Sequence, residues 1–175
     1  MEIKVLRESG YEEAMLGLSL SFGKPVEDMP RVAEKLYDRD DSESKFLRQI
    51  VVWLDIVGPR YWWQQFDTYS VGTPKQSSST MHTIMKRELD QSDFEQGVPN
   101  DLLFIVNNFI QLGDFNIVKR ILPESFLQRR IVCTNYQVLR RIIRQRKNHK
   151  LPEWKEVITG ILNQIEHKEF FADFV

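Results

Sequence analysis

Apolar residues in this chain recur at three- and four-residue spacing in segments of about a dozen residues, most of them ended by glycine or proline. Such spacing places the apolar side chains on one face of a helix. The pattern predicts helices at 11–22, 26–37, 46–57, 100–111, 115–122, 135–146 and 151–165, and one more that begins after Gly58-Pro59. Alternation over 2–7 and an extended or irregular segment at 126–134 add short strands. The predicted class is α+β, mostly helical with a small antiparallel or mixed sheet.

The length of 175 residues suits one domain spanning 1–175. Hydrophobic residues make up 42% of the chain, and eleven Phe, five Tyr and four Trp supply large side chains for a core. This composition excludes a disordered protein. No internal repeat and no point of division is evident.

Several classes of protein are excluded by what the sequence lacks. No apolar run reaches the ~20 residues needed to cross a bilayer, and no secretory segment is expected at the N-terminus. Cys133 is the only cysteine, so an internal disulfide framework is excluded and a reducing compartment is expected. The three histidines are far apart and match no zinc-ligand spacing. We therefore expect a cytoplasmic protein without a metal.

The helix predicted at 135–146 is the most informative segment. Its apolar stripe consists of Leu139, Ile142 and Ile143. Asn135 and Arg146 fall on the same stripe, whereas the other arginines of the helix are predicted to face solvent: Arg140, Arg141 and Arg144. An arginine on a buried stripe is costly unless an anion or several acceptors meet it. Its partner is either an internal carboxylate or a ligand's phosphate or enolate-like oxygen.

Charge is distributed unevenly around this helix. Residues 126–151 include eight Lys or Arg and no Asp or Glu, although the net charge of the chain is −1. The segment is either a solvated basic face or a surface that attracts a nucleotide or nucleic acid. Few aromatic residues are interleaved with the basic ones, which argues against nucleic-acid binding.

A second informative segment runs from 59 to 69. Its aromatic stripe is Trp62, Phe66 and Tyr69, and the opposite side carries Tyr61, Gln64 and Thr68. A helix with aromatic residues on both sides is usually buried on both, in the core or at a subunit contact. The polar side suits a pocket, and the hydroxyl-rich loop at 70–80 is either an ordinary polar loop or a cradle for a phosphate.

Taken together, these segments resemble the flavin-dependent thymidylate synthases. The firmer match is C-terminal: Lys119-Arg120-Ile121-Leu122-Pro123, then Asn135, Leu139 and Arg146, then a final helix from 151. The family also has the signature Arg-His-Arg, seven residues, then Ser. This chain has Asp67-Thr68-Tyr69, seven residues and Ser77, so the frame is kept while the three signature residues differ. The resemblance covers roughly Leu47 to the end, and it extends to divergent, phage-encoded members.

The resemblance implies roles for individual residues. Arg146 takes the place of the arginine that holds and polarises the uracil ring of deoxyuridylate (dUMP). The implied nucleotide-binding residues are Gln64, Ser77, Ser79, Lys119, Asn135 and Arg146, and the implied cofactor-binding residues are Tyr69 and Asn135. Lys119 and Ser79 each replace an arginine of the family. Losing cations from a dianion site is costly, because each charge-assisted contact is worth roughly 1.5–3 kcal/mol.

Three functions follow as hypotheses. The first is a nucleotide-binding protein on this fold, without the family's catalysis, that sequesters a pyrimidine nucleotide between subunits. The second is an active flavoenzyme that methylates dUMP using FAD and methylene-tetrahydrofolate. The third is an interaction protein whose basic face binds an acidic partner. The first is favoured because the residues that would hold the flavin are replaced. The resemblance also implies a homotetramer, with the Trp62/Trp63 helix near a subunit contact.

Overall fold

The computed structural model describes residues 1–174 and is built on a four-stranded antiparallel sheet. Its strands are β1 (Glu2–Ser9), β2 (Val51–Pro59), β3 (Lys75–Ser77) and β4 (Leu127–Asn135), in the order β1-β2-β4-β3. β2 and β4 are central and pair along their whole length, from Val51 opposite Asn135 to Pro59 opposite Leu127. The predicted α+β class is therefore confirmed.

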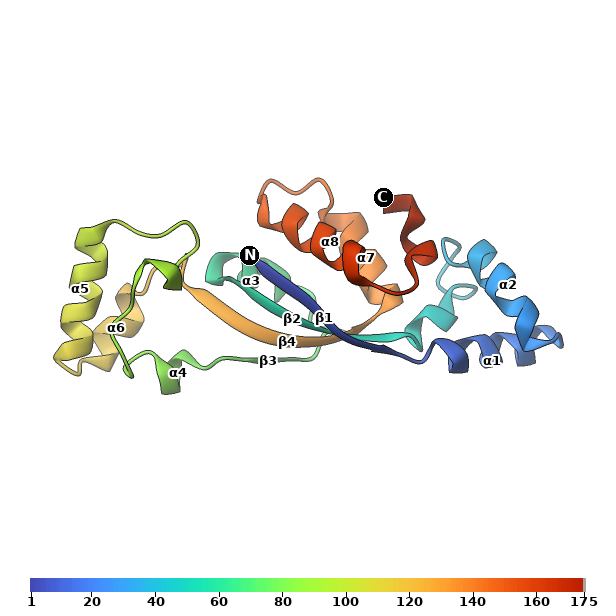
Figure 1. Cartoon of the computed structure of the whole chain (residues 1–175), viewed down its shortest axis with the longest axis horizontal. Helices are drawn as coiled ribbons and strands as arrows, with labels where there is room; N and C mark the ends of the chain where they lie inside the picture. Colours follow the sequence, from blue (N-terminus) through green and yellow to red (C-terminus); the bar gives the residue numbers. More distant parts are fainter. Residues whose placement is uncertain (175) are drawn as a thin grey trace.

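Eight α-helices accompany the sheet in the described part of the chain (Figure 1). They are α1 (Tyr11–Phe22), α2 (Met29–Leu36), α3 (Arg60–Phe66), α4 (Thr80–Thr83), α5 (Asn100–Gln111), α6 (Phe115–Ile121), α7 (Tyr136–Arg146) and α8 (Glu153–Gln164). Short 3₁₀ segments lie between them, and the last one spans Lys168–Phe174. No helix among residues 1–174 combines the length and the apolar character required to span a membrane.

The helix predicted at 46–57 is wrong, because most of this segment is strand β2. A 3₁₀ turn at Lys45–Arg48 precedes the strand. In β2, Val52, Leu54 and Ile56 are buried on one face, while the intervening residues are half-exposed on the other. Both faces carry apolar side chains, so the two-residue period is hidden in a continuous apolar run. β-Branched residues in such a run favour a strand.

The main core lies on one face of the sheet, beneath α3, α7 and α8 (Figure 1). Its largest fully buried side chains include Trp62, Trp63, Trp154, Tyr136 and Phe170. A separate apolar cluster lies at the α5–α6 end of the molecule. Its buried members are Ile84, Leu89, Phe94, Val106, Ile110, Val118, Leu122 and Phe126. Helices α1 and α2 extend from the opposite end of the sheet.

Local signals set the start of several helices. The side chain of Asn135 accepts a hydrogen bond from the backbone N–H of Val138 at 3.0 Å and caps α7. Asp114 caps α6 in the same way through Ile117. Gly10 precedes α1 with φ +96°, and a Cβ atom there would fall onto the carbonyl oxygen of Gln49. Only glycine fits that close approach.

The C-terminal segment is pinned to α7 by Arg140. The guanidinium of this residue donates to the carbonyl oxygen of Phe170 and forms ion pairs with Asp173 at 2.7 Å and Asp38 at 2.8 Å. Arg140 is only 4% exposed, so the prediction that it faces solvent is wrong. Helical periodicity could not reveal this partner, because the segment that covers Arg140 returns to it from 30 residues further along the chain.

Candidate functional site

Arg146, the last residue of α7, is half-buried and directed at the end of α3. Its Nε donates to the Tyr69 hydroxyl at 2.8 Å. Its two terminal nitrogens lie 3.5 Å from the Gln65 side-chain oxygen and 3.4 Å from the Thr68 hydroxyl, which are weak hydrogen bonds. Among the described residues, no carboxylate pairs with Arg146.

Aromatic rings hold the Arg146 guanidinium in place. It lies 5.3 Å from the ring centroid of Tyr69 and 5.1 Å from that of Trp154, within cation–π range. The Tyr69 hydroxyl, besides accepting from Arg146, donates to Gln145 at 2.9 Å. The arginine is therefore fixed by neutral groups and keeps its positive charge uncompensated. Arg140, on the same helix, is fully paired and structural by comparison.

Asp67, which takes the first position of the family signature, is paired with two cations. Its two carboxylate oxygens accept hydrogen bonds from the Arg130 guanidinium at 2.9 and 3.1 Å, and one of them lies 3.2 Å from the Lys75 ammonium. Arg130 comes from β4 and Lys75 from β3, while Asp67 follows α3. Neither cation was identified individually from the sequence. Lys75 is a single lysine within the 70–80 loop and Arg130 is one of eight basic residues in 126–151. Their convergence on Asp67 depends on the antiparallel register of β3 and β4.

Lys119 lies in α6 and donates from its ammonium to the hydroxyl of Thr80. Thr80 was not a predicted site residue, but it directly follows Ser79, which was. Burial lowers the pKa of Lys119 below its ordinary value, and the charge of Arg60 lowers it further. Ion pairs within 4 Å are absent for Lys119 in the part of the chain that the structure describes. An anion at this place would relieve the repulsion between Lys119 and Arg60.

Gln64 is exposed on the outer side of α3 and donates to Glu124 at 2.8 Å. The same carboxylate forms an ion pair with Arg60 at 3.1 Å. Gln64 therefore belongs with the Arg60–Lys119 neighbourhood and makes no hydrogen bond to the Arg146 group. α3 does have the predicted polar face, but the side-chain amide of Gln64 on that face is already hydrogen-bonded to Glu124.

The other predicted residues are dispersed. Ser77 is exposed on β3, opposite Arg130 in the strand pairing. Asn135 caps the start of α7, whereas Arg146 ends that helix; at 1.5 Å per residue the two lie about 16 Å apart. The structure thus brings Tyr69 together with Arg146, and it brings Lys119 to Thr80, the residue after Ser79. It leaves Gln64, Ser77 and Asn135 outside the Arg146 group.

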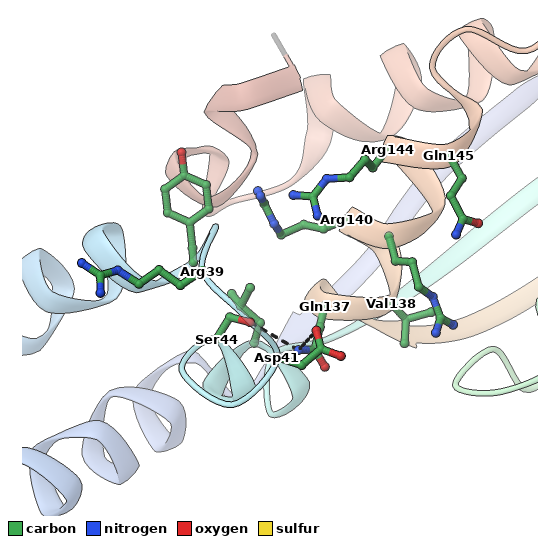
Figure 2. Close-up of a pocket in the computed structure, with 11 residues that line it drawn as sticks. Arg39, Asp41, Ser44, Gln137, Val138, Arg140, Arg144 and Gln145 are labelled. Carbon is green, nitrogen blue, oxygen red and sulfur yellow. Dashed lines mark hydrogen bonds between the residues drawn. The ribbon is translucent and has the colours of Figure 1, made fainter.

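A basic pocket lies along α7, from Gln137 to Gln145 (Figure 2). Its volume is about 320 Å³, at the small end of the ~300–1,000 Å³ range of ligand sites. The charged residues that line it are Arg39, Asp41, Arg140, Arg141 and Arg144. Ser44 and Gln137 meet across it at 3.4 Å. The sequence predicts the basic character of this helix, but it gives no sign that residues 37–47 form the opposite side of the pocket.

Metal ligation has no support in the described residues. Among residues 1–174, no three His, Cys, Asp or Glu side chains are arranged to hold a metal ion. Cys133 lies half-exposed on β4 with a free thiol.

Comparison with solved structures gives a full-length match. A crystal structure of flavin-dependent thymidylate synthase ThyX from Helicobacter pylori, complexed with FAD and dUMP, matches with a TM-score of 0.84 at 14% identity over 100% of both chains. A second structure of ThyX from Helicobacter pylori with FAD and dUMP matches with a TM-score of 0.82 at 15% identity over 99% of each chain. This chain has the ThyX fold. No protein-family profile and no curated protein sequence matches it.

The ThyX fold raises the question of whether a flavin fits the residues present. The signature position carries Asp67, a carboxylate, and its two cationic neighbours are engaged with it. The basic pocket beside α7, at about 320 Å³, is open and lies at the lower limit for a whole small ligand. Asp67 thus occupies the two cations that this position would otherwise offer to the phosphates of a flavin dinucleotide. The ThyX fold at 14% identity fixes the architecture, and the chemistry has to be argued from this chain's own side chains.

Proposed function

We propose that this protein binds a pyrimidine nucleotide on the ThyX fold and does not carry out flavin-dependent methylation. The observation that carries the proposal is Arg146, an arginine oriented by Tyr69 and Trp154 that meets only neutral oxygens in the described residues. A guanidinium fork of this kind suits a ring carbonyl with partial negative charge. The neighbours that bind dUMP and FAD support the choice of ligand class.

The second group of residues supports a phosphate-bearing ligand. Arg60 and Lys119 are close enough for their charges to oppose each other, and Glu124 offsets only part of that positive charge. Thr80 adds a hydroxyl beside Lys119. Such a group suits the dianionic end of a nucleotide. We further propose that the Arg146 group of one copy and the Lys119 group of another face the same ligand, within a homo-oligomer.

The test is a thermal-shift panel on the purified chain, with dUMP, other pyrimidine nucleotides, purine nucleotides and deoxyuridine as probes. We expect dUMP or a related pyrimidine nucleotide to raise the melting temperature, because a ligand that binds only the folded state stabilises it. Arg146→Ala is expected to abolish this shift while leaving the melting temperature without ligand within a few degrees of the original. Arg31→Ala, an exposed arginine of α2, is the matched control and is expected to keep the full shift.

Three outcomes contradict the proposal in different ways. An unchanged nucleotide response in Arg146→Ala removes this residue from the site. Purified protein that carries flavin absorbance and methylates dUMP supports an active flavoenzyme instead. Protein that ignores every nucleotide but is retained on acidic partners in a salt-sensitive way supports the basic-face interaction hypothesis.

A further inference from the structure

The carboxylate of Asp67 lies at a place where two cations converge. Arg130 and Lys75 are 14% and 19% exposed, whereas Asp67 is 44% exposed. The cations are thus set into the structure and the carboxylate covers them from the solvent side. One negative charge faces two positive charges, so the group keeps a net charge of about +1.

Both cations are held in place by other contacts. The Arg130 guanidinium lies 4.4 Å from the ring centroid of Trp63, and it donates to Gln128 at 3.2 Å. The Lys75 ammonium lies 5.3 Å from the ring centroid of Phe66. Within residues 1–174, the buried Nε of Arg130 has no hydrogen-bond partner. Removing the carboxylate would therefore leave the two cations positioned and incompletely satisfied.

Asp67 is poorly placed for the stability of its own helix. It is the C-cap of α3, where the helix dipole disfavours a negative charge and favours a positive one. Neither helix capping nor the core accounts for a carboxylate at this position. Its main partners are the two cations, and its half-exposed position leaves it free to move away from them.

We infer that Arg130 and Lys75 form a binding site for a phosphate group, and that Asp67 is a built-in anion that occupies this site until a ligand displaces it. The inference deepens the proposed function and rests on it for the source of the phosphate, a nucleotide. Asp67 precedes Thr68, which contacts Arg146, so Arg130 and Lys75 would meet the phosphate from the copy that supplies Arg146, and the Lys119 group of the other copy would meet the same phosphate from the opposite side. The shared chemistry is a phosphate monoester or free phosphate. Asp67 then lowers the affinity for every ligand, since the phosphate has to displace the Asp67 carboxylate from Arg130 and Lys75.

The test measures the dissociation constants of inorganic phosphate, dUMP and deoxyuridine by calorimetry, for the unchanged chain and for Asp67→Asn. Asp67→Asn is expected to tighten binding of phosphate and dUMP about tenfold, the scale of one charge-assisted contact. Deoxyuridine, which lacks the phosphate, is expected to show no gain. Competition between phosphate and dUMP on the variant then distinguishes a nucleotide site from a site for free phosphate.

The control is Asp55→Asn. Asp55 forms a two-point ion pair with Arg129, the residue before Arg130, on the other face of the sheet. That substitution frees one exposed arginine without a converging second cation and is expected to leave phosphate binding unchanged. An equal gain in Asp55→Asn, or no gain in Asp67→Asn, overturns the inference. The melting temperature of each variant without ligand is compared first, to establish that it is folded.

A second variant keeps the test independent of the stability of Asp67→Asn. Lys75→Met, made in the chain that keeps Asp67, retains the apolar stem over Phe66 and removes one cation. The weak phosphate binding of the unchanged chain is expected to become undetectable in this variant. A retained response overturns the inference. The proposed function fails separately, through the nucleotide response of Arg146→Ala. If phosphate binding tightens in Asp67→Asn while no nucleotide binds, the anion site is supported and the proposed nucleotide-binding function is contradicted.

Discussion

At the scale of single residues, the surroundings of a charge matter more than its position on a helix. Arg140 and Arg146 lie on the same helix, and the periodicity of that helix assigned Arg140 to solvent. In the structure, Arg140 is closed off by Asp38, Asp173 and the Phe170 carbonyl, whereas Arg146 meets neutral oxygens and rings. Periodicity describes which side a residue takes, but it contains no information about what returns from elsewhere in the chain to cover that side.

The same limit applies to Asp67. The sequence showed that a carboxylate stands where the related family has a cation, but it left open whether that charge is repelled or compensated. The register of β3 against β4 places Lys75 and Arg130 beside it. Side-chain pairs between distant strands are set by register, which no local pattern in this chain specifies.

Gly10 offers a stability prediction at this scale. Gly10→Ala combines a positive φ with a collision against the Gln49 carbonyl, whereas Gly23→Ala, at the other end of α1, has φ +60° and no atom within 4 Å. Gly23→Ala is expected to lower the free energy of unfolding by about 1 kcal/mol, and Gly10→Ala by about 1–3 kcal/mol more. Urea unfolding of both variants measures the difference. Equal losses would show that the backbone near Gln49 moves aside at little cost.

At the scale of elements, helices with a polar face were the most predictable. α1 and α5 begin and end at the predicted residues, because a capping or breaking residue flanks each one. β2 was mistaken for a helix, since both of its faces carry apolar side chains. The short strand β3 lies within the segment 70–80, which the sequence predicts as a loop of either kind, because three residues at the edge of a sheet are too few to show a period.

The C-terminal segment Lys168–Phe174 gives a prediction for an element held by one residue. Arg140→Met leaves Asp173 and Asp38 with only the exposed Arg144 as a partner and leaves the carbonyl oxygen of Phe170 without its donor. It is expected to lower the free energy of unfolding by about 2 kcal/mol. Hydrogen exchange in 168–174 is expected to accelerate at the same time.

Arg144→Met is the control, because Arg144 approaches the same two carboxylates from a position that is 57% exposed. It is expected to cost less than about 1 kcal/mol. Comparable losses in the two variants would mean that burial of Arg140 contributes little to holding the segment.

At the scale of the whole molecule, the residues of the candidate site form two separate groups in one chain. The Arg146 group and the Lys119 group share no hydrogen bond in the described residues, and Gln64 and Ser77 are exposed. Trp62 and Trp63 are fully buried within the chain, so a subunit contact at α3 would use its polar outer side. The sequence predicted the fold and the identity of these groups better than their spatial grouping.

We predict a homo-oligomer, with a tetramer as the expected form. Light scattering after gel filtration is expected to give a mass near four times 20.8 kDa at micromolar concentration. Dilution below the dissociation range should abolish the nucleotide-induced thermal shift together with the assembly, because both depend on the same contact. A monomer that binds nucleotide with full affinity would contradict a ligand held between copies.

The separate apolar cluster at the α5–α6 end has a consequence for heating. Its buried side chains pack among themselves, while those of the main core pack beneath α3, α7 and α8. Regions with independent packing lose their structure at different temperatures unless their shared boundary is extensive. The α5–α6 end can therefore melt first while the sheet persists, and Lys119 of α6 would be lost from the site before Arg146. A nucleotide bound to both the Lys119 group and the Arg146 group would make the α5–α6 end and the sheet unfold in a single thermal transition.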